Sequence, residues 1–204
     1  GHGNTTTVTV KVDINEAPTL TAEDKTTNSN TSVTGNYTGA DRDDDSLNYT
    51  VSDAPKNGSV VLNTDGTYTY TPNEDFAGDD SFVIAVDDGK GGITTEEVNI
   101  KVNALPEVEF AVGFEEFNVI EDQPLKINLD DFITIFDKET KPEDILVDIA
   151  NQPSNGTVRY DEASKSFIYT PNKDYFGKDN FVIRVKDEHG GIVEVIIPVE
   201  VAPV

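Results

Sequence analysis

Short runs of alternating hydrophobic and polar residues recur along almost the whole chain. Residues 67–71 alternate strictly, and the run 82–86 places its largest apolar residues at every second position. A period of two predicts strands that bury one face, and the β-branched and aromatic residues in these runs fit a pleated, half-buried surface. Asp65-Gly66 between two such runs predicts a tight hairpin turn. Residues 128–133 break the pattern, and we expect a single helical turn there, capped by Asn128.

The chain also contains an internal repeat. Residues 71–93 and 170–192 are identical at 14 of 23 positions, and residues 57–60 match residues 155–158. The spacing is the size of one β-sandwich domain, and each repeat holds about seven predicted strands. The sequence therefore predicts an all-β chain: two tandem seven-stranded Greek-key sandwiches of cadherin or Ig type, joined end to end by a short linker.

Domain boundaries follow from the repeat and from prolines that end strands. We expect residues 1–17 to comprise a cloning remnant followed by the last strand (residues 4–12) and the linker of a preceding repeat. Repeat 1 is expected over residues 18–103 and repeat 2 over residues 104–204. Proline stiffens both short junctions, which favours stacked modules over domains on a flexible tether.

The charge balance restricts the partners. The 204 residues include 39 acidic and 15 basic side chains, a net charge of −24, and the two halves of the chain carry equal shares. Such a surface repels nucleic acid and anionic membranes. The lack of cysteine excludes disulfides, thiolate chemistry and sulfur-based metal sites. No apolar run is long enough to insert across a bilayer.

Acidic residues gather where the pattern predicts loops. Calcium takes six to eight oxygen ligands from loops of this kind, and a bound divalent cation would relieve the self-repulsion of the chain. Alternate positions of the run 41–45 present their carboxylates to one side. The candidate ligands in repeat 1 are Asp41, Asp43, Asp45, Asp87 and Asp88. Those of repeat 2 are Asn103, Asp137, Glu139 and Asp187, a poorer set because Lys186 stands where repeat 1 has Asp87.

Three elements occur in the same order in both repeats: Tyr-Thr-Pro-Asn, Gly-x-Asp-x-Phe and Asp-x-x-Gly-Gly. The strings that carry them, GSVVLNTDGTYTYTPNEDFAGDDSFVIAVDDGKGG and NGTVRYDEASKSFIYTPNKDYFGKDNFVIRVKDEHGG, resemble the cadherin-like and Ig-like tandem repeats of large bacterial surface adhesins, in the style of type I-secreted RTX adhesins. The resemblance covers the chain from about Val8 onward. It implies a secreted, extracellular β-sandwich that binds Ca²⁺ and acts as an extender or adhesive module, as in biofilms.

The same resemblance implies further calcium ligands. Asp13, Asn15 and Glu16 match the acidic linker that precedes a cadherin module, and Glu121 aligns with the cadherin strand-A glutamate. The Asp-Arg-Glu motif in the middle of cadherin modules has no equivalent here.

We therefore expect a calcium-stiffened, monomeric tandem repeat whose partners are the neighbouring repeats of the same chain. Two alternatives stay open: acidic turns that bind no metal, and a module that binds surface polysaccharide or another adhesin directly. Tyr37, Phe110 and Phe114 are the candidate exposed aromatic residues for direct binding. An enzyme is not expected, because His189 falls in a predicted Gly-Gly turn and the acidic turns recur in both repeats.

Overall fold

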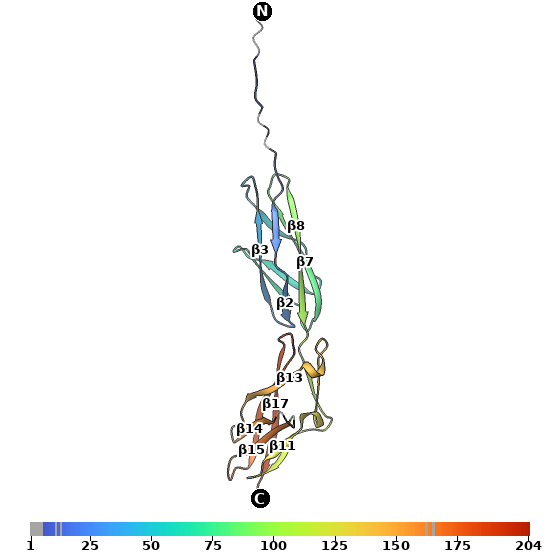
Figure 1. Ribbon diagram of the computed structural model, residues 1–204, viewed down its shortest axis with the longest axis vertical. Coiled ribbons are helices and arrows are strands. Elements are labelled where there is room, and N and C mark those ends of the chain that lie inside the picture. Colours follow the sequence, from blue (N-terminus) through green and yellow to red (C-terminus); the bar gives the residue numbers. More distant parts are fainter. Residues whose placement is uncertain (1–5, 11, 13, 162, 165) are drawn as a thin grey trace, which may run out of the picture. The chain divides into compact units, whose positions relative to one another are not determined.

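A computed structural model describes residues 6–10, 12, 14–161, 163–164 and 166–204 (Figure 1). Its contacts divide the chain into two compact units, one of residues 1–73 with 79–101 and one of residues 74–78 with 102–204. Both units are built from strands, and the only helical elements of the described residues are two three-residue 3-10 turns. The predicted all-β class with two tandem Ig-like domains is confirmed.

Repeat 1 is a sandwich of two four-stranded sheets, in the orders β1-β3-β6-β5 and β2-β8-β7-β4. The first two strands are halves of one edge segment that passes from one sheet to the other, so the eight recorded strands correspond to the seven expected. This is the strand arrangement of an Ig sandwich. The strands are β1 (Thr19–Ala22), β2 (Lys25–Asn28), β3 (Val33–Ala40), β4 (Asn48–Asp53), β5 (Gly58–Leu62), β6 (Thr67–Pro72), β7 (Gly78–Asp87) and β8 (Ile93–Asn103).

The core of repeat 1 lies where the alternation predicted it. Tyr68 and Tyr70 of β6 are fully buried, as are Phe82, Ile84 and Val86 of β7. The rings of Tyr68 and Phe82 meet edge to face, with their centroids 5.1 Å apart. Side chains of a strand alternate between the two faces of its sheet, so every second residue of these strands reaches the space between the sheets.

Repeat 2 repeats this plan with one strand interrupted. Its sheets have the orders β10-β17-β16-β13 and β11-β15-β14, with β12 and β9 forming a separate two-stranded ribbon. The strands are β9 (Glu107–Phe110), β10 (Phe117–Ile120), β11 (Leu125–Ile127), β12 (Ile133–Phe136), β13 (Leu146–Asn151), β14 (Gly156–Asp161), β15 (Ser166–Pro171), β16 (Gly177–Lys186) and β17 (Ile192–Ala202). The 3-10 turns are η1 (Leu129–Asp131) and η2 (Pro142–Asp144).

The turn η1 is the helical turn that the sequence predicted, and it separates β11 from β12. The expected side-chain cap is wrong. The backbone N–H of Asp131 bonds to the carbonyl of Asn128, while the Asn128 amide donates to the Asp131 carboxylate at 3.4 Å. In so short a turn the backbone carbonyl already satisfies the N–H group that a cap would serve.

The strand expected over residues 4–12 is not formed in the described residues of that stretch. Residues 6–10 and 12 have no regular structure, and Val8, Val10 and Val12 are each more than 70% exposed. A strand requires a hydrogen-bonded neighbour, and no described strand pairs with this segment.

A buried aspartate ties two loops together in each repeat. Asp80, 8% exposed, accepts hydrogen bonds from the backbone N–H groups of Lys56, Asn57 and Ser81 at 3.0–3.1 Å and from the Tyr70 hydroxyl at 2.9 Å. Burial, reinforced by the carboxylate, raises the pKa of Tyr70, which keeps its hydroxyl a donor.

The same arrangement recurs around Asp179 in repeat 2. Its carboxylate accepts from the backbone N–H groups of Ser154, Asn155 and Asn180 and from the Tyr169 hydroxyl at 2.8 Å. This explains the order of the shared elements: the Tyr of Tyr-Thr-Pro-Asn and the Asp of Gly-x-Asp-x-Phe hold the Asn-Gly turn.

We predict that Asp80→Ala lowers the free energy of unfolding of repeat 1 by about 2–4 kcal/mol, because it leaves several buried donors without an acceptor. Asp79→Ala is the matched control: this neighbour is exposed, and its loss should change stability by less than about 0.5 kcal/mol. Urea unfolding of the whole chain, followed by tyrosine fluorescence, measures both. Equal effects of the two changes would contradict a structural role for Asp80.

Candidate metal centres

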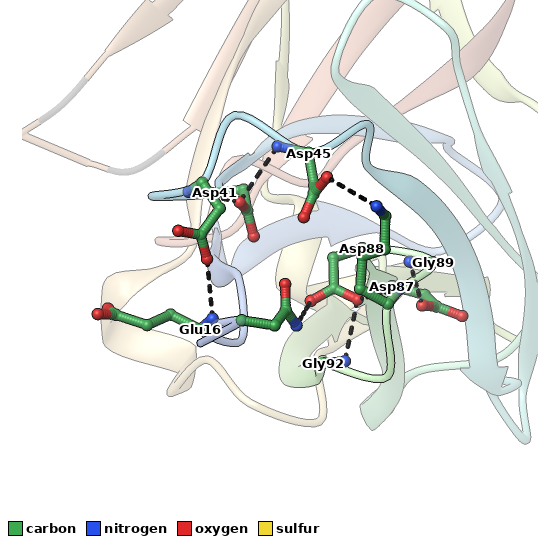
Figure 2. Close-up of polar contacts among 10 residues, drawn as sticks. Glu16, Asp41, Asp45, Asp87, Asp88, Gly89 and Gly92 are labelled. Atoms are coloured by element: carbon green, nitrogen blue, oxygen red, sulfur yellow. Dashed lines mark hydrogen bonds and ion pairs between the residues drawn. The ribbon is translucent and has the colours of Figure 1, made fainter. Parts of the chain in front are cut away.

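The first acidic cluster lies at the end of repeat 1 where β7 finishes and the N-terminal segment arrives (Figure 2). Asp88 follows β7 directly and is only 3% exposed. One carboxylate oxygen accepts from the Asn15 amide at 2.8 Å, and the other accepts from the backbone N–H groups of Lys90 and Gly92 at 2.7 and 2.9 Å. The segment before β1 is thereby tied to the turn between β7 and β8.

The loop after β3 supplies the second part of this cluster. Asp41 Oδ1 accepts from the backbone N–H groups of Asp43 and Asp45 at 2.8 and 3.2 Å, and Asp43 Oδ2 accepts from the N–H of Glu16 at 2.9 Å. Asp41 Oδ2 is buried and has no hydrogen-bond partner. Two basic residues neutralise part of the surrounding charge: Arg42 pairs with Glu16 at 2.7 Å and Lys90 with Asp45 at 3.7 Å.

Repeat 2 builds an equivalent cluster. The Asn103 amide donates to Asp187 Oδ2 at 2.8 Å, and Asp187 Oδ1 accepts from the backbone N–H groups of His189 and Gly191. The loop after β12 contributes Asp137, whose Oδ1 accepts from the N–H groups of Glu139 and Thr140 at 3.0 and 2.6 Å. Asn103, Asp137 and Asp187 therefore occupy the places that Asn15, Asp41 and Asp88 hold in repeat 1.

Three oxygens of this second loop are buried without hydrogen-bond partners. They are Asp137 Oδ2, Glu139 Oε2 and Thr140 Oγ1. Asp137 and Thr140 are only 6% and 4% exposed, so water does not replace the missing partners freely. A buried, unpaired carboxylate oxygen is costly unless a cation or a donor meets it.

Lys186 does not weaken this cluster in the way the sequence suggested. Its ammonium group lies 2.6 Å from the Asp148 carboxylate, which Arg184 also contacts at 2.8 Å. Bonds from these two bases lower the pKa of Asp148. Lys186 and Asp187 are adjacent, and adjacent residues of an extended chain point to opposite sides, so the base is engaged away from Asp187.

The second glycine of Asp-x-x-Gly-Gly is required by a close approach. A Cβ on Gly92 would collide with the Asp88 carboxylate, and one on Gly191 would collide with that of Asp187. The first glycine, Gly91 or Gly190, has a positive φ that side chains rarely adopt. The motif thus places an aspartate carboxylate over its own turn in both repeats.

Other predicted ligands lie apart from these centres. The Asp87 carboxylate accepts a hydrogen bond from the N–H of Gly89 on its own turn. The Glu121 carboxylate accepts from the N–H of Val204, which follows the last residue of β17, whereas Asp187 lies before the first residue of that strand. Asp13 lies outside the described residues. Among the residues that the structure describes, no group of three acidic or histidine side chains is placed to hold a metal ion. Amide, hydroxyl or carbonyl oxygens would have to complete either site. The sequence does not predict Thr140 as a candidate ligand, because hydroxyl residues are common throughout it.

The aromatic candidates for direct ligand binding differ from expectation in one case. Tyr37 is buried, at 7% exposure, because its hydroxyl donates to the Asn63 carbonyl and its ring packs on Tyr49. Phe110, the last residue of β9, is 37% exposed, and its ring stacks on that of Phe114 with centroids 5.0 Å apart.

Comparisons with known proteins agree with the strand arrangement. A family model described as "Bacterial Ig domain" matches residues 15–101 and again residues 105–200. No curated protein matches the chain. None of the described helical turns is long or apolar enough to cross a membrane.

Several solved structures are similar at low identity. A titin I-band fragment, I67–I69, has a TM-score of 0.42 and 14% identity over 92% of this chain and 66% of its own. Drosophila N-cadherin EC1-4 has a TM-score of 0.43 and 13% identity, over 92% of this chain and 50% of its own. An endo-fucoidan hydrolase of glycoside hydrolase family 107, MfFcnA4, has a TM-score of 0.38 and 16% identity, over 92% of this chain and 29% of its own. The chain thus spans less than a third of that hydrolase and half of the cadherin.

Acid should release the segment that carries Asn15. The Asn15 hydrogen bond, with help from backbone donors, holds the pKa of Asp88 below its ordinary value of 3.8. The stabilisation is therefore fully present above that pH and is lost as the pH falls through the lower folded-state pKa. The NMR signals of the Asn15 side-chain amide should stay constant from pH 7 to about 4 and shift below it. Asp88→Asn should remove this dependence, and a transition near pH 6 would contradict the assignment.

Proposed function

The chain belongs to the bacterial Ig domain family, whose members are usually extracellular or on the cell surface, and from this premise we propose that it is a calcium-stiffened tandem repeat of a large surface adhesin. Its role is to extend and orient an adhesive module, with the neighbouring repeats of the same chain as its partners. The tandem Ig-like domains and the recurrence of one acidic centre in each of them support this proposal.

A single observation carries the calcium assignment. Asp137 is only 6% exposed, yet its carboxylate oxygen Oδ2 meets no hydrogen-bond donor. The other carboxylate oxygen, Oδ1, accepts hydrogen bonds from two backbone N–H groups of its own loop. The loop therefore fixes the aspartate in place and leaves one anionic oxygen for a cation. The equivalent aspartate of repeat 1, Asp41, leaves the corresponding oxygen buried and unpartnered as well.

The donor set fits a hard divalent cation. All candidate groups are oxygens, from carboxylates, a hydroxyl and an asparagine amide, which suits calcium and excludes metals that require sulfur or imidazole. In repeat 2 the acids Asp137, Glu139 and Asp187 would have to close around the ion, with Asn103, Thr140 and backbone carbonyls completing the shell. In repeat 1 the corresponding groups are Asp41, Asp43, Asp88, Asn15 and Glu16. A bound ion would offset carboxylate repulsion and fix the segment that enters each module against two loops.

We expect repeat 2 to hold the stronger site, in contrast to the ranking suggested by counting acids. Its loop carries three buried oxygens without partners, whereas that of repeat 1 carries one. The acids around the repeat 1 site also pair with Arg42 and Lys90, which a cation would have to displace. Charge count overstates repeat 1 because many of its acids already have partners.

Calcium should raise the melting temperature of the chain. A site filled at one hundred times its Kd adds about 2.7 kcal/mol, which corresponds to roughly 10 °C or more for a domain of about 100 residues. Asp137→Asn should abolish most of this rise. Without calcium the same variant should melt no lower than the wild type, because the amide keeps an acceptor for the loop and removes an unpaired buried charge.

Scanning calorimetry with calcium and with chelator measures these melting temperatures, and three controls accompany it. Asp144→Asn, in the exposed turn η2, should change neither curve. Asp41→Asn should reduce the calcium response less than Asp137→Asn does. Magnesium at the same concentration should act weakly, because it demands a tighter octahedral shell. No calcium response in the wild type, or a response that Asp137→Asn leaves intact, would contradict the proposal.

A further inference from the structure

A groove of about 580 Å³ lies on repeat 1, and its lining residues Gly39 and Leu47 flank the acidic loop of residues 41–45. It forms where the hairpin of β5 and β6 stops short of the end of β3. The last ladder contacts of β6 are with Val33–Asn36, and the N–H of Tyr37 bonds to the carbonyl of Gly66 in the hairpin turn. Beyond that point, no described strand pairs with β3 on this side, and the start of β4 forms the other wall.

Tyr49 covers the open edge of β3. The Gly39 N–H donates to the Tyr49 hydroxyl oxygen at 3.1 Å. In a longer ladder, a backbone carbonyl of a neighbouring strand would accept this hydrogen bond. A Cβ on Gly39 would clash with that hydroxyl, so only glycine admits the ring here. On its other side the ring packs against Tyr37, with centroids 5.0 Å apart.

Hydrogen bonds to the β5–β6 hairpin fix the residues of the groove wall. The Tyr37 hydroxyl donates to the Asn63 carbonyl at 2.8 Å, and the Asn63 amide donates to the hydroxyls of Thr67 and Thr69. Asp65, at the tip of the hairpin, turns its carboxylate back onto Thr67. Tyr49 is therefore a fixed, half-buried aromatic surface before any ligand arrives, which lowers the entropic cost of binding.

The lining of this groove has no charged residue, in a chain of net charge −24. It consists of Tyr37, Thr38, Gly39, Leu47, Asn48, Tyr49, Leu62, Asn63, Thr64 and Gly66. Three other hollows of the described surface each include at least three charged side chains. Exposed Thr38, Asn48 and Thr64 surround the half-buried Leu47, Tyr49 and Leu62, so apolar surface lies within a rim of uncharged hydrogen-bonding groups.

We propose that this groove binds a neutral oligosaccharide. A sugar ring offers an apolar face of C–H groups to Tyr49 and hydroxyls to the asparagine and threonine rim, which matches both parts of the lining. The field of the whole chain repels sulfated or uronic acid polymers. An apolar peptide would bury the asparagine and threonine side chains against groups that cannot satisfy them.

Repeat 2 provides an internal control, because its equivalent positions have lost this chemistry. Strand registers align Tyr49 with Val147 and Asn48 with Leu146, since both pairs face the same partners at the end of β7 and β16. Asn63 corresponds to Asp161, which brings a carboxylate to the site. None of the groove-lining residues is a proposed calcium ligand, and sugar binding there would add a function to the spacer role.

The test uses the whole chain with short neutral oligomers of glucose, mannose and xylose, and with an oligogalacturonate as the anionic counterpart. Titration calorimetry should detect saturable binding of at least one neutral oligomer and none of the oligogalacturonate. Tyr49→Ala should weaken it at least tenfold, about 1.4 kcal/mol. Asn48→Ala, at an exposed position that leaves the core intact, should weaken it several-fold, while Leu146→Ala in repeat 2 should leave it unchanged.

Three outcomes would overturn the proposal. One is that no neutral oligomer binds; another is that binding survives both Tyr49→Ala and Asn48→Ala. The third is saturable binding of an apolar peptide at the groove without sugar binding, which would make the occupant a protein segment. Tyr49→Phe separates the ring from the hydroxyl: if the ring is the platform, it should retain most of the affinity.

Discussion

Carboxylates that accept backbone N–H groups hold the loops of both repeats, and the use of their second oxygen decides what each one does. Asp80 and Asp179 use both oxygens within the protein, with a tyrosine hydroxyl completing the set. Asp41 and Asp137 use one oxygen for their own loop and leave the other buried and unpartnered. The first pair is complete without a metal and acts as internal scaffold. In the proposed function, a cation supplies the missing contact of the second pair.

This division explains how a chain of net charge −24 forms two packed sandwiches. The cost of placing carboxylates at loop ends is offset where each one meets several donors. A further concentration of acidic side chains lies where the entering segment meets the loops after the second and sixth strands of the sandwich, at Asn15 in repeat 1 and Asn103 in repeat 2. In the proposed function that concentration makes chain stiffness respond to calcium, while the cores, which are apolar and aromatic, stay folded without it.

The sequence predicts the fold well because its signal is local. Strict alternation in β6 and β7 identifies the buried residues, and the repeat with its turn residues gives two sandwiches. The site is predicted less completely, because a carboxylate looks the same in sequence whether it is satisfied or not. Asp87 and Asp88 are equal candidates in sequence, yet only Asp88 meets the entering segment. The burial of Tyr37 and the role of Thr140 depend on loops that fold back over long sequence distances, which no local pattern reports.

Counting bound ions is the most direct test of calcium binding by the two repeats. Native mass spectrometry of the intact chain, in a volatile buffer with micromolar calcium, resolves each added ion as a separate mass. We expect one ion to bind first and a second to follow at higher calcium, and we expect Asp137→Asn to remove the first. A chain that stays free of calcium while a known calcium-binding protein in the same buffer is loaded would contradict it. So would a first ion that persists in Asp137→Asn, because the unpartnered oxygen of that residue is the basis of the assignment.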